Sequence, residues 1–166
     1  MSLEDMFKSI AIASANDASV AVSEYIAGNT DKFVAMMNQK AKELNLKNVE
    51  IVHARAEEFG QNKKYREKFD IATSRAVANL STLSEYLLPL VKIKGKCICM
   101  KASEAQEEIE QAKKAIEVLG GTIENVKEFT LPESDIGRTI IKIDKIKETP
   151  KKYPRKPGTP TKEPIK

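Results

Sequence analysis

The sequence has little of what marks a metal enzyme, a disulfide-stabilised protein or a membrane protein. It contains one histidine and two cysteines, and the cysteines, Cys97 and Cys99, lie two residues apart. Cysteines at that spacing cannot bridge distant parts of a fold, so we expect no disulfide scaffold. A single histidine and a single cysteine pair also disfavour a metal site. No apolar run approaches the ~20 residues of a membrane helix and no signal sequence opens the chain, so we expect a cytoplasmic protein.

Glycine and proline are scarce in the first part of the chain. The first glycine is Gly28 and the first proline is Pro89, whereas five of the seven prolines follow residue 149. Since these two residue types interrupt regular structure, we expect one α/β domain over 1–148, with an atypical N-terminal unit over 1–30. Residues 149–166 are expected to form an extended tail of polyproline character. Hydrophobic residues make up 41% of the 166 residues, which is enough for a buried core.

The positive charge is concentrated at the C-terminal end. The net charge is +4, but the segment Lys145–Lys166 holds eight basic and two acidic residues, so the rest of the chain is slightly acidic. A basic tail without an apolar face indicates a polyanionic partner, which favours nucleic acid over a membrane surface. The alternative is a solvated chain end with no partner.

The apolar pattern predicts strands that alternate with helices. The short β-branched or apolar runs predicted as strands are Lys8–Ala15, Val49–His53, Phe69–Ser74, Gly95–Lys101, Thr122–Phe129 and Thr139–Asp144. The segments with helical periodicity are Ala18–Ala27, Asp31–Leu44, Leu80–Val91 and Ser103–Leu119. The last of these begins with a capping-box pattern at Ser103 and ends at Gly120-Gly121. Alternation predicts a mostly parallel α/β sheet, and the last two strands, with no helix between them, predict an antiparallel hairpin. This layout is typical of Rossmann-like methyltransferases.

Several segments together resemble one family. They are Lys47–Gln61, Phe69–Ala102, Lys113–Gly121 and Thr149–Ile165, with the most specific matches at Arg55–Phe59, Ser74–Ala78 and Lys152–Pro160. From about Asp31 to the C-terminus, the chain resembles the GidB/RsmG family. Members of this family use S-adenosylmethionine to methylate N7 of a guanine in small-subunit ribosomal RNA. The resemblance implies the same fold, cofactor and RNA substrate for this chain.

The resemblance also implies which residues form the site. It places Ala56 and Glu57 beside the adenine of the cofactor and Arg75 in the cofactor site, at the carboxyl end of a strand where α/β sheets bind ligands. An arginine there would hold the methionine carboxylate, or orient the guanine or a phosphate. The RNA-binding candidates are Lys101, Arg138, Lys151, Lys152, Arg155 and Lys156. Alternatively, Glu57 only favours a helix start and Arg75 only forms a surface ion pair.

The residues that remain are consistent with a reaction that needs no acid–base group. N7 of guanine is itself a nucleophile, so alignment with the methyl group is sufficient. His53 is therefore expected to be a packing or surface residue, and Cys97 and Cys99 to be buried as small hydrophobic side chains.

The first thirty residues depart from the family pattern. Family members have a glycine-rich cofactor loop after their first strand and an acidic residue after their second, but this chain has no glycine before Gly28. No segment of the sequence reads as the second strand, and Asp31 is a loose substitute for its acid. A second hypothesis is therefore a catalytically inactive, truncated or chimeric domain with weak RNA affinity. A missing strand would also leave an exposed sheet edge, which predicts a homodimer.

Overall fold

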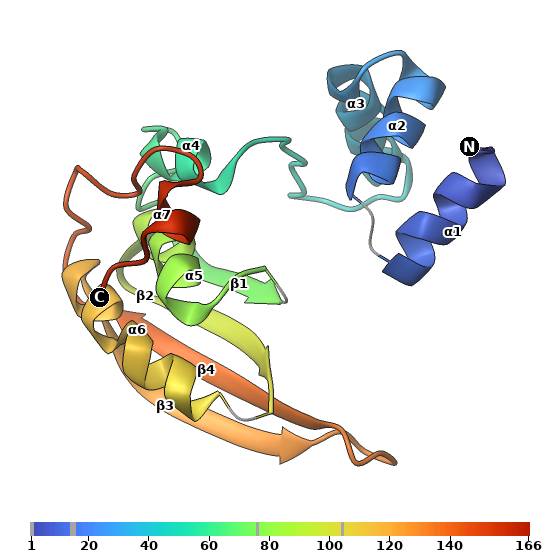
Figure 1. Ribbon diagram of the computed structural model, residues 1–166. Helices are drawn as coiled ribbons and strands as arrows, with labels where there is room; N and C mark the ends of the chain where they lie inside the picture. The colour runs from blue at the N-terminus through green and yellow to red at the C-terminus, as the bar shows by residue number, and fades with distance from the viewer. Residues whose placement is uncertain (1, 14–15, 76, 104) are drawn as a thin grey trace. The chain divides into compact units, whose positions relative to one another are not determined.

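The computed structural model describes residues 2–13, 16–75, 77–103 and 105–166. It divides into two compact units, Met1–His53 and Ala54–Lys166, which we call the N-terminal unit and the C-terminal unit (Figure 1). The sequence does not predict this boundary, and the limits that it does predict, 1–148 and 149–166, stay a prediction. None of the described helices combines the length and apolar character that crossing a membrane requires.

The N-terminal unit is helical throughout its regular structure, with α1 (Leu3–Ala13), α2 (Asn16–Ala27) and α3 (Thr30–Glu43). The strand predicted over Lys8–Ala15 is wrong for residues 8–13, which lie in α1, while residues 14–15 are outside the described residues. The reason is a capping box at Ser2. The Asp5 amide donates to the Ser2 hydroxyl (3.1 Å) and the Ser2 amide donates to the Asp5 carboxylate (3.0 Å). This cap starts a helix that the following alanines favour.

The helices predicted over Ala18–Ala27 and Asp31–Leu44 are confirmed as α2 and α3, each with slightly different ends. The strand predicted over Val49–His53 is wrong, because the segment has no strand partner. Instead, the Asn38 side chain donates to the Ile51 carbonyl (3.0 Å) and accepts from the Ile51 amide (2.9 Å). One side-chain amide thus satisfies the backbone groups that a neighbouring strand would otherwise pair.

The C-terminal unit is a four-stranded sheet with helices. Its elements are α4 (Ala56–Gln61), β1 (Phe69–Arg75), α5 (Leu80–Leu87), a 3-10 turn (Leu88–Leu90), β2 (Val91–Ala102), α6 (Gln106–Val118), β3 (Gly121–Thr130), β4 (Gly137–Lys145) and α7 (Thr159–Lys162). The strand order is β1-β2-β4-β3. The α/β class and the antiparallel β3–β4 hairpin are confirmed. Only the β1–β2 pair is parallel, because the segments expected to add parallel strands are a helix and a loop.

Two helix ends differ from the prediction. The helix expected to reach Val91 stops at Leu87, since Pro89 has no N–H to donate and forces a 3-10 turn. The capping box expected at Ser103 does not start α6, whose N-cap is Ala105, and Glu104 lies outside the described residues. The predicted stop is confirmed, because Gly120 adopts φ +86° against the Lys147 carbonyl.

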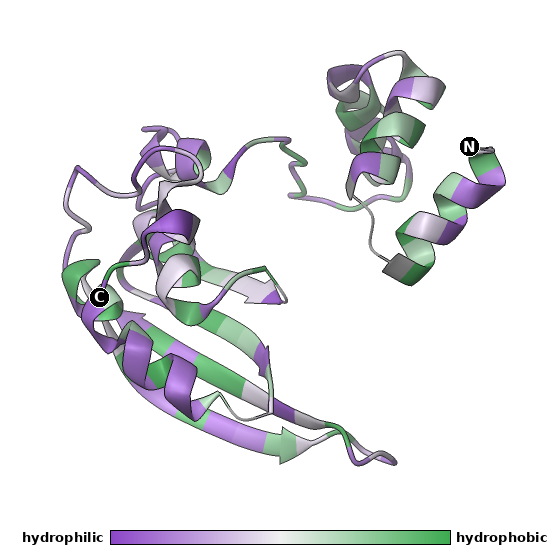
Figure 2. Cartoon of the chain, viewed as in Figure 1, coloured by the Kyte–Doolittle hydropathy of each residue, from purple (hydrophilic) through white to green (hydrophobic). Residues whose placement is uncertain are grey.

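The core lies between the sheet and the helices α5 and α6, which cover one face of it (Figure 1). Apolar bands run along β2 and β4 (Figure 2). The largest apolar side chains buried there are Leu80, Leu83, Leu88, Val91, Ile116, Leu119, Ile141 and Ile143. Cys97 and Cys99 are buried among them, as predicted, and burial raises the pKa of both thiols, that of Cys99 to about 12. Both cysteines therefore act as packing groups.

A network of ion pairs joins three strands. The Lys96 ammonium contacts Asp144 (2.5 Å) and Glu124 (2.8 Å), and Lys142 contacts Glu124 (3.0 Å). Hydrogen bonds from Lys96 and then Lys142 lower the pKa of the Glu124 carboxyl from 4.5 to about 2. Because the folded-state pKa is lowered, the network stabilises the fold above pH 4.5 and this contribution is lost as the pH falls towards 2.

We expect Glu124→Gln to lower the denaturation midpoint at pH 7, with the difference from the wild type shrinking between pH 4.5 and 2. Urea unfolding at pH 7, 4 and 2 measures this. Glu128→Gln, at an exposed carboxylate of the same strand, is the matched control and should show a smaller effect at pH 7. A difference that stays constant down to pH 2 would contradict the assignment.

Candidate functional site

A pocket of about 720 Å³ lies where β1 and β2 end. It is lined by Arg75, Met100, Lys101, Ala102, Glu108, Phe129, Leu131, Arg138, Thr139 and Ile140. The carboxyl ends of parallel strands are where open α/β sheets bind ligands. The start of β4 and the end of β3 complete the wall, because both strands run antiparallel to their neighbours.

The pocket brings together three of the residues singled out from the sequence: Arg75, Lys101 and Arg138. Arg75 is the last residue of β1 and lies opposite Met100 of β2. Arg138 lies opposite Ala102, near the start of β4, and donates to the Gly137 carbonyl (2.8 Å). The Arg75 side chain is exposed and that of Arg138 is half-buried, so the pocket presents two guanidinium groups to an anionic ligand.

Lys101 has a different role from that of a free surface lysine. Its ammonium donates to the Ala78 carbonyl (2.6 Å) and to the Glu108 carboxylate (2.5 Å), and its side chain is only 12% exposed. The same Glu108 oxygen accepts a short hydrogen bond from the Leu80 amide. Lys101 and Glu108 therefore tie the end of β2 and the start of α6 to the start of α5. The sequence analysis does not single out Glu108 as a site residue. The only feature that could have indicated it is its position as an acidic residue in the first turn of a predicted helix.

Two hydroxyls near this end of the sheet have no hydrogen-bond partner in the described part of the chain. They are the buried Oγ of Ser74 and the buried Oγ1 of Thr139. Thr139 lines the pocket, and Ser74 directly precedes Arg75 at the end of β1. Buried hydroxyls are nearly always paired, so an unpaired one beside a pocket indicates a place for a ligand group.

Ala56 and Glu57 lie outside the lining of this pocket, in the first turn of α4. Glu57 is buried, and its carboxylate accepts from the Gly158 amide (2.9 Å). That bond joins α4 to the C-terminal segment, a contact that the sequence gave no means of finding. The assignment of Ala56 and Glu57 to the adenine stays a prediction.

The segment Thr149–Ile165, which we call the C-terminal strap, runs past α4 and α5 (Figure 1) and is hydrogen-bonded to residues of both helices and to Arg66. Arg66 donates to the carbonyls of Thr149 and Tyr153, each at 2.7 Å. Gln61 donates to the Pro154 carbonyl (2.7 Å). Further along, side chains of α5 donate to the strap: Thr82 to Pro160 (3.0 Å) and Ser81 to Ile165 (2.9 Å).

A buried lysine anchors the strap at its start. Lys145 donates to the Leu88 carbonyl (2.6 Å) and to the Thr149 hydroxyl (2.5 Å), and its ammonium contacts Glu67 (3.0 Å). Burial lowers the pKa of Lys145, while Glu67 acts in the opposite direction. This lysine counts toward the basic C-terminal segment in the sequence, yet it is inaccessible to a polyanion.

Arg155 pairs with a buried acid. Its guanidinium contacts Glu85 (2.7 Å), a residue of α5 with a 1% exposed side chain, and its backbone amide donates to the same carboxylate (2.7 Å). The hydrogen bond with Glu85 raises the pKa of Arg155. Lys151, Lys152 and Lys156 are exposed, as is Lys162, so these strap cations are accessible to a polyanion. His53 is exposed, in line with the surface or packing role expected.

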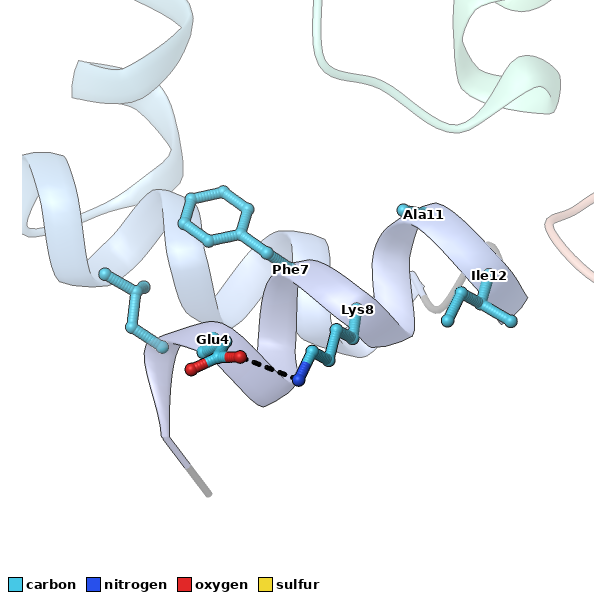
Figure 3. Close-up of a pocket in the computed structure, with 6 residues that line it drawn as sticks. Glu4, Phe7, Lys8, Ala11 and Ile12 are labelled. Atoms are coloured by element: carbon cyan, nitrogen blue, oxygen red, sulfur yellow. Dashed lines mark ion pairs between the residues drawn. The ribbon is translucent and has the colours of Figure 1, made fainter.

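A second hollow lies on one face of α1 (Figure 3). Its lining residues are Leu3, Glu4, Phe7, Lys8, Ala11 and Ile12, and Glu4 pairs with Lys8 (2.7 Å). All six come from one helix and the single charged pair is self-neutralising. This hollow offers no converging polar groups, and we do not assign a site to it.

The sheet and the cationic pocket at the carboxyl ends of its parallel strands define an α/β protein with a candidate ligand site where such sheets bind ligands. The family model described as GidB, rRNA small subunit methyltransferase G, matches residues 19–137. Relatives named Ribosomal RNA small subunit methyltransferase G are 54% identical over 140 residues in Geobacillus sp. (strain WCH70) and 51% identical in Bacillus subtilis (strain 168). Both alignments cover 84% of this chain. The chain belongs to the GidB family.

The chain spans about three fifths of the length of the relatives it matches, 59% in both cases. Among solved structures, the rRNA methylase from Streptococcus thermophilus is 14% identical, with a TM-score of 0.46 over 71% of this chain and 70% of that one. M. jannaschii TYW2 in complex with AdoMet is also 14% identical, with a TM-score of 0.47 over 70% of this chain and 55% of that one.

We expect Arg155→Met to destabilise the protein by about 3 kcal/mol, because it leaves the buried Glu85 carboxylate without its charge partner. Chemical denaturation measures the free energy of unfolding. The double variant Glu85→Leu/Arg155→Met removes both charges and should recover at least half of the loss. A single variant as stable as the wild type, or a double variant that loses more, would show that the pair does not hold the strap.

Proposed function

We propose that the chain acts in the S-adenosylmethionine-dependent methylation of N7 of a guanine in small-subunit ribosomal RNA. The observation that carries the proposal is the pocket containing Arg75 and Arg138, at the carboxyl ends of β1 and β2, in a member of the GidB family. The substrate follows from relatives named as small-subunit ribosomal RNA methyltransferases. The bacterial cytoplasm, where ribosomes are assembled, is the compartment proposed with it.

The residues of the pocket fit the proposed cofactor. Its volume lies within the ~300–1,000 Å³ of small-molecule sites. The Arg75 guanidinium suits a carboxylate, and the unpartnered hydroxyls of Ser74 and Thr139 suit polar groups of a ligand. Ala56 and Glu57 are proposed to contact the adenine, in which case the Glu57 carboxylate is shared with the Gly158 amide. When bound, the cofactor supplies the electrophilic methyl group.

The proposed reaction requires little acid–base catalysis from the protein. The guanine N7 carries a lone pair at neutral pH, so the residues around it need only hold the base in line and exclude water. Arg138, at the mouth of the pocket, is proposed to face the RNA. The absence of a catalytic acid–base pair among the residues singled out from the sequence is consistent with this reaction.

The exposed lysines of the strap are proposed to bind RNA phosphates, namely Lys151, Lys152 and Lys156. Lys101 and Arg155 belong to the same proposed set, but each already pairs with a carboxylate of this chain. Their contribution to RNA affinity is therefore expected to be smaller than that of the exposed lysines.

We also propose that two copies pair weakly through the outer edge of β1, which lies at the end of the strand order. Light scattering over a range of concentrations tests this pairing. A molecular mass that stays at that of a monomer throughout the range would exclude it.

Calorimetric titration of S-adenosylmethionine and S-adenosylhomocysteine into the purified protein tests the proposed function. We expect micromolar binding to the wild type, a loss of at least tenfold in Arg75→Ala, and no change in Lys113→Ala, an exposed lysine of α6 paired with Glu110. No binding up to millimolar cofactor would instead favour the inactive-domain hypothesis for this chain.

Replacement of Lys151, Lys152 and Lys156 by alanine in one triple variant should weaken RNA binding. It should also make the plot of log K, the association constant for RNA, against log salt concentration less steep by about 2, at ~0.7 per phosphate contact. Fluorescence anisotropy with a single-stranded fragment of small-subunit ribosomal RNA measures both. The triple variant Lys113→Ala/Lys114→Ala/Lys127→Ala removes the same charge from α6 and β3 and is the control. Equal losses in the two triple variants would mean that the strap has no special role.

A further inference from the structure

We infer that the C-terminal unit has a second RNA-contacting surface, remote from the pocket, which binds the phosphates of a double-helical RNA segment. It consists of the loop 62–68, between α4 and β1, and the start of the strap, residues 149–153. We call these two segments the Arg66 patch, after the residue that joins them. The inference rests on the proposed function, because it states which feature of a ribosomal RNA substrate the chain holds besides the guanine.

Arg66 joins the loop to the strap. Its guanidinium donates to the carbonyls of Thr149 and Tyr153 (2.7 Å each) and to that of Pro150 (3.4 Å). The Tyr153 amide donates to the Pro150 carbonyl (2.9 Å), so residues 150–153 form a tight turn. A guanidinium bound to three carbonyls of one short segment fixes the path of that segment beside the loop.

Four exposed lysines lie on these two segments. Lys151 and Lys152 are the central residues of the turn, and Lys63 and Lys68 lie on either side of Arg66 in the loop. None of the four is paired with a carboxylate in the part of the chain that the structure describes. Their charges are therefore available to a partner, and two of them come from a loop that the proposed RNA-binding set does not include.

The backbone of the loop is held as firmly as that of the turn. The Asn62 carbonyl accepts from the amides of Tyr65 and Arg66 (2.9 Å each), and the Lys68 amide donates to the Leu90 carbonyl (3.0 Å). Because both segments are fixed, the four lysines stay together on one surface without a cost of ordering their backbone. Such a surface suits the regular array of charges along a nucleic acid.

The acidic residue of the patch does not offset these lysines. Glu67 is the one acid in residues 62–68 and 149–153. Its carboxylate contacts the buried Lys145 ammonium (3.0 Å) and accepts from the Thr149 amide (2.8 Å). The charge of Glu67 is thus used inside the fold, and the exposed side of the patch is cationic.

The rings of the patch are engaged within the protein. The Tyr65 ring stacks on Phe59, with centroids 4.0 Å apart, and the Lys64 ammonium lies 4.7 Å from the Tyr65 centroid. Tyr153 is buried. Proteins bind single-stranded RNA largely by stacking its bases on aromatic rings, whereas they bind double-helical RNA through phosphates and sugars. Lysines without a free ring therefore favour a double helix. Phe69, which follows the loop, is 38% exposed, so the test includes a Phe69 variant.

The patch and the pocket lie at opposite ends of β1. The loop ends where β1 begins, at Phe69, and the last residue of β1 is Arg75, which lines the pocket. Six steps along a strand, at ~3.3 Å per residue, give a separation of about 20 Å. An RNA that occupies both sites must therefore carry its helical segment about 20 Å from the guanine. A hairpin RNA with the guanine in its loop has this form.

The first test measures binding of an RNA duplex of about 12 base pairs by fluorescence anisotropy, without the cofactor and at several salt concentrations. We expect Lys63→Ala/Lys68→Ala to lower the affinity at least fivefold. It should also make the plot of log K against log salt concentration less steep by about 1–2, at ~0.7–0.9 per phosphate contact. Lys113→Ala/Lys114→Ala, at two exposed lysines of α6, is the matched control and should lower the affinity less than twofold. Phe69→Leu should leave duplex binding unchanged.

The second test locates the helix on the protein. Cys97 and Cys99 are buried, so a thiol-directed iron chelate labels a cysteine introduced at the surface. Glu58→Cys lies on an exposed position of α4, one turn before the loop, and Glu117→Cys lies on an exposed position of α6. The chelate at position 58 should cleave the stem of the hairpin RNA, and the chelate at position 117 should not.

The positions changed are exposed, and thermal unfolding should show that each variant folds. Equal losses in the two lysine double variants would overturn the inference, as would stem cleavage from position 117 alone. A loss in Phe69→Leu as large as that in Lys63→Ala/Lys68→Ala would assign the site to stacked single-stranded bases instead. Vesicles of phosphatidylserine that bind as tightly as the duplex would assign it to a lipid surface. The cofactor titration of Arg75→Ala reports on the other end of β1, so the proposed function can fail or succeed independently of these outcomes.

Discussion

The structure of the C-terminal unit depends on one buried carboxylate, that of Glu85. Its side chain is 1% exposed in α5, and a charge so far from water is tolerated only when a cation and hydrogen bonds satisfy it. Arg155 supplies both, through its guanidinium and its backbone amide. The chain must therefore return to α5 after β4, and this return brings the strap against α4. The segment that reads in the sequence as a solvated basic tail has in the structure a buried side, which includes Tyr153, Pro154 and Pro160, and an exposed side that bears its lysines.

The wall of the pocket is also stabilised by a charged pair that is largely removed from water, Lys101 and Glu108. Lys101 and Glu108 satisfy each other and also bind backbone groups of residues 78 and 80, so the wall of the pocket is fixed by contacts that leave Arg75 free. A site that binds a charged ligand needs groups that are held in place but not already neutralised. Four charged residues line the pocket: Lys101 and Glu108 pair with each other, and the guanidinium groups of Arg75 and Arg138 are the ones proposed to meet a ligand.

Sequence reasoning succeeded where local chemistry agrees with the tertiary fold. The four strands of the sheet have clearly alternating polar and apolar residues or β-branched runs. Gly120 follows the end of α6 because glycine adopts a positive φ without strain. It failed where a side chain competes with the backbone pattern. Ser2 and Asp5 start a helix through a run that resembles a strand, and Asn38 takes the hydrogen bonds of Ile51. Neither Glu108 nor the partner of Arg155 was predictable, because their contacts join residues far apart in the chain. Arg75 and Lys101 are predictable as neighbours because strand ends meet at one edge, whereas Arg138 is placed near them only by the family resemblance.

The contacts of the strap have a consequence for the order in which the molecule is made. The groups that satisfy Glu57, Glu85 and Thr82 lie between Arg155 and Pro160, so they emerge from the ribosome 70 to 101 residues after the side chains that they bind. Until then these side chains of α4 and α5 lack the hydrogen-bond partners that the strap supplies. A nascent chain stalled anywhere before the strap should therefore lack these contacts of α4 and α5, so the C-terminal unit cannot complete its fold until the strap has been synthesised.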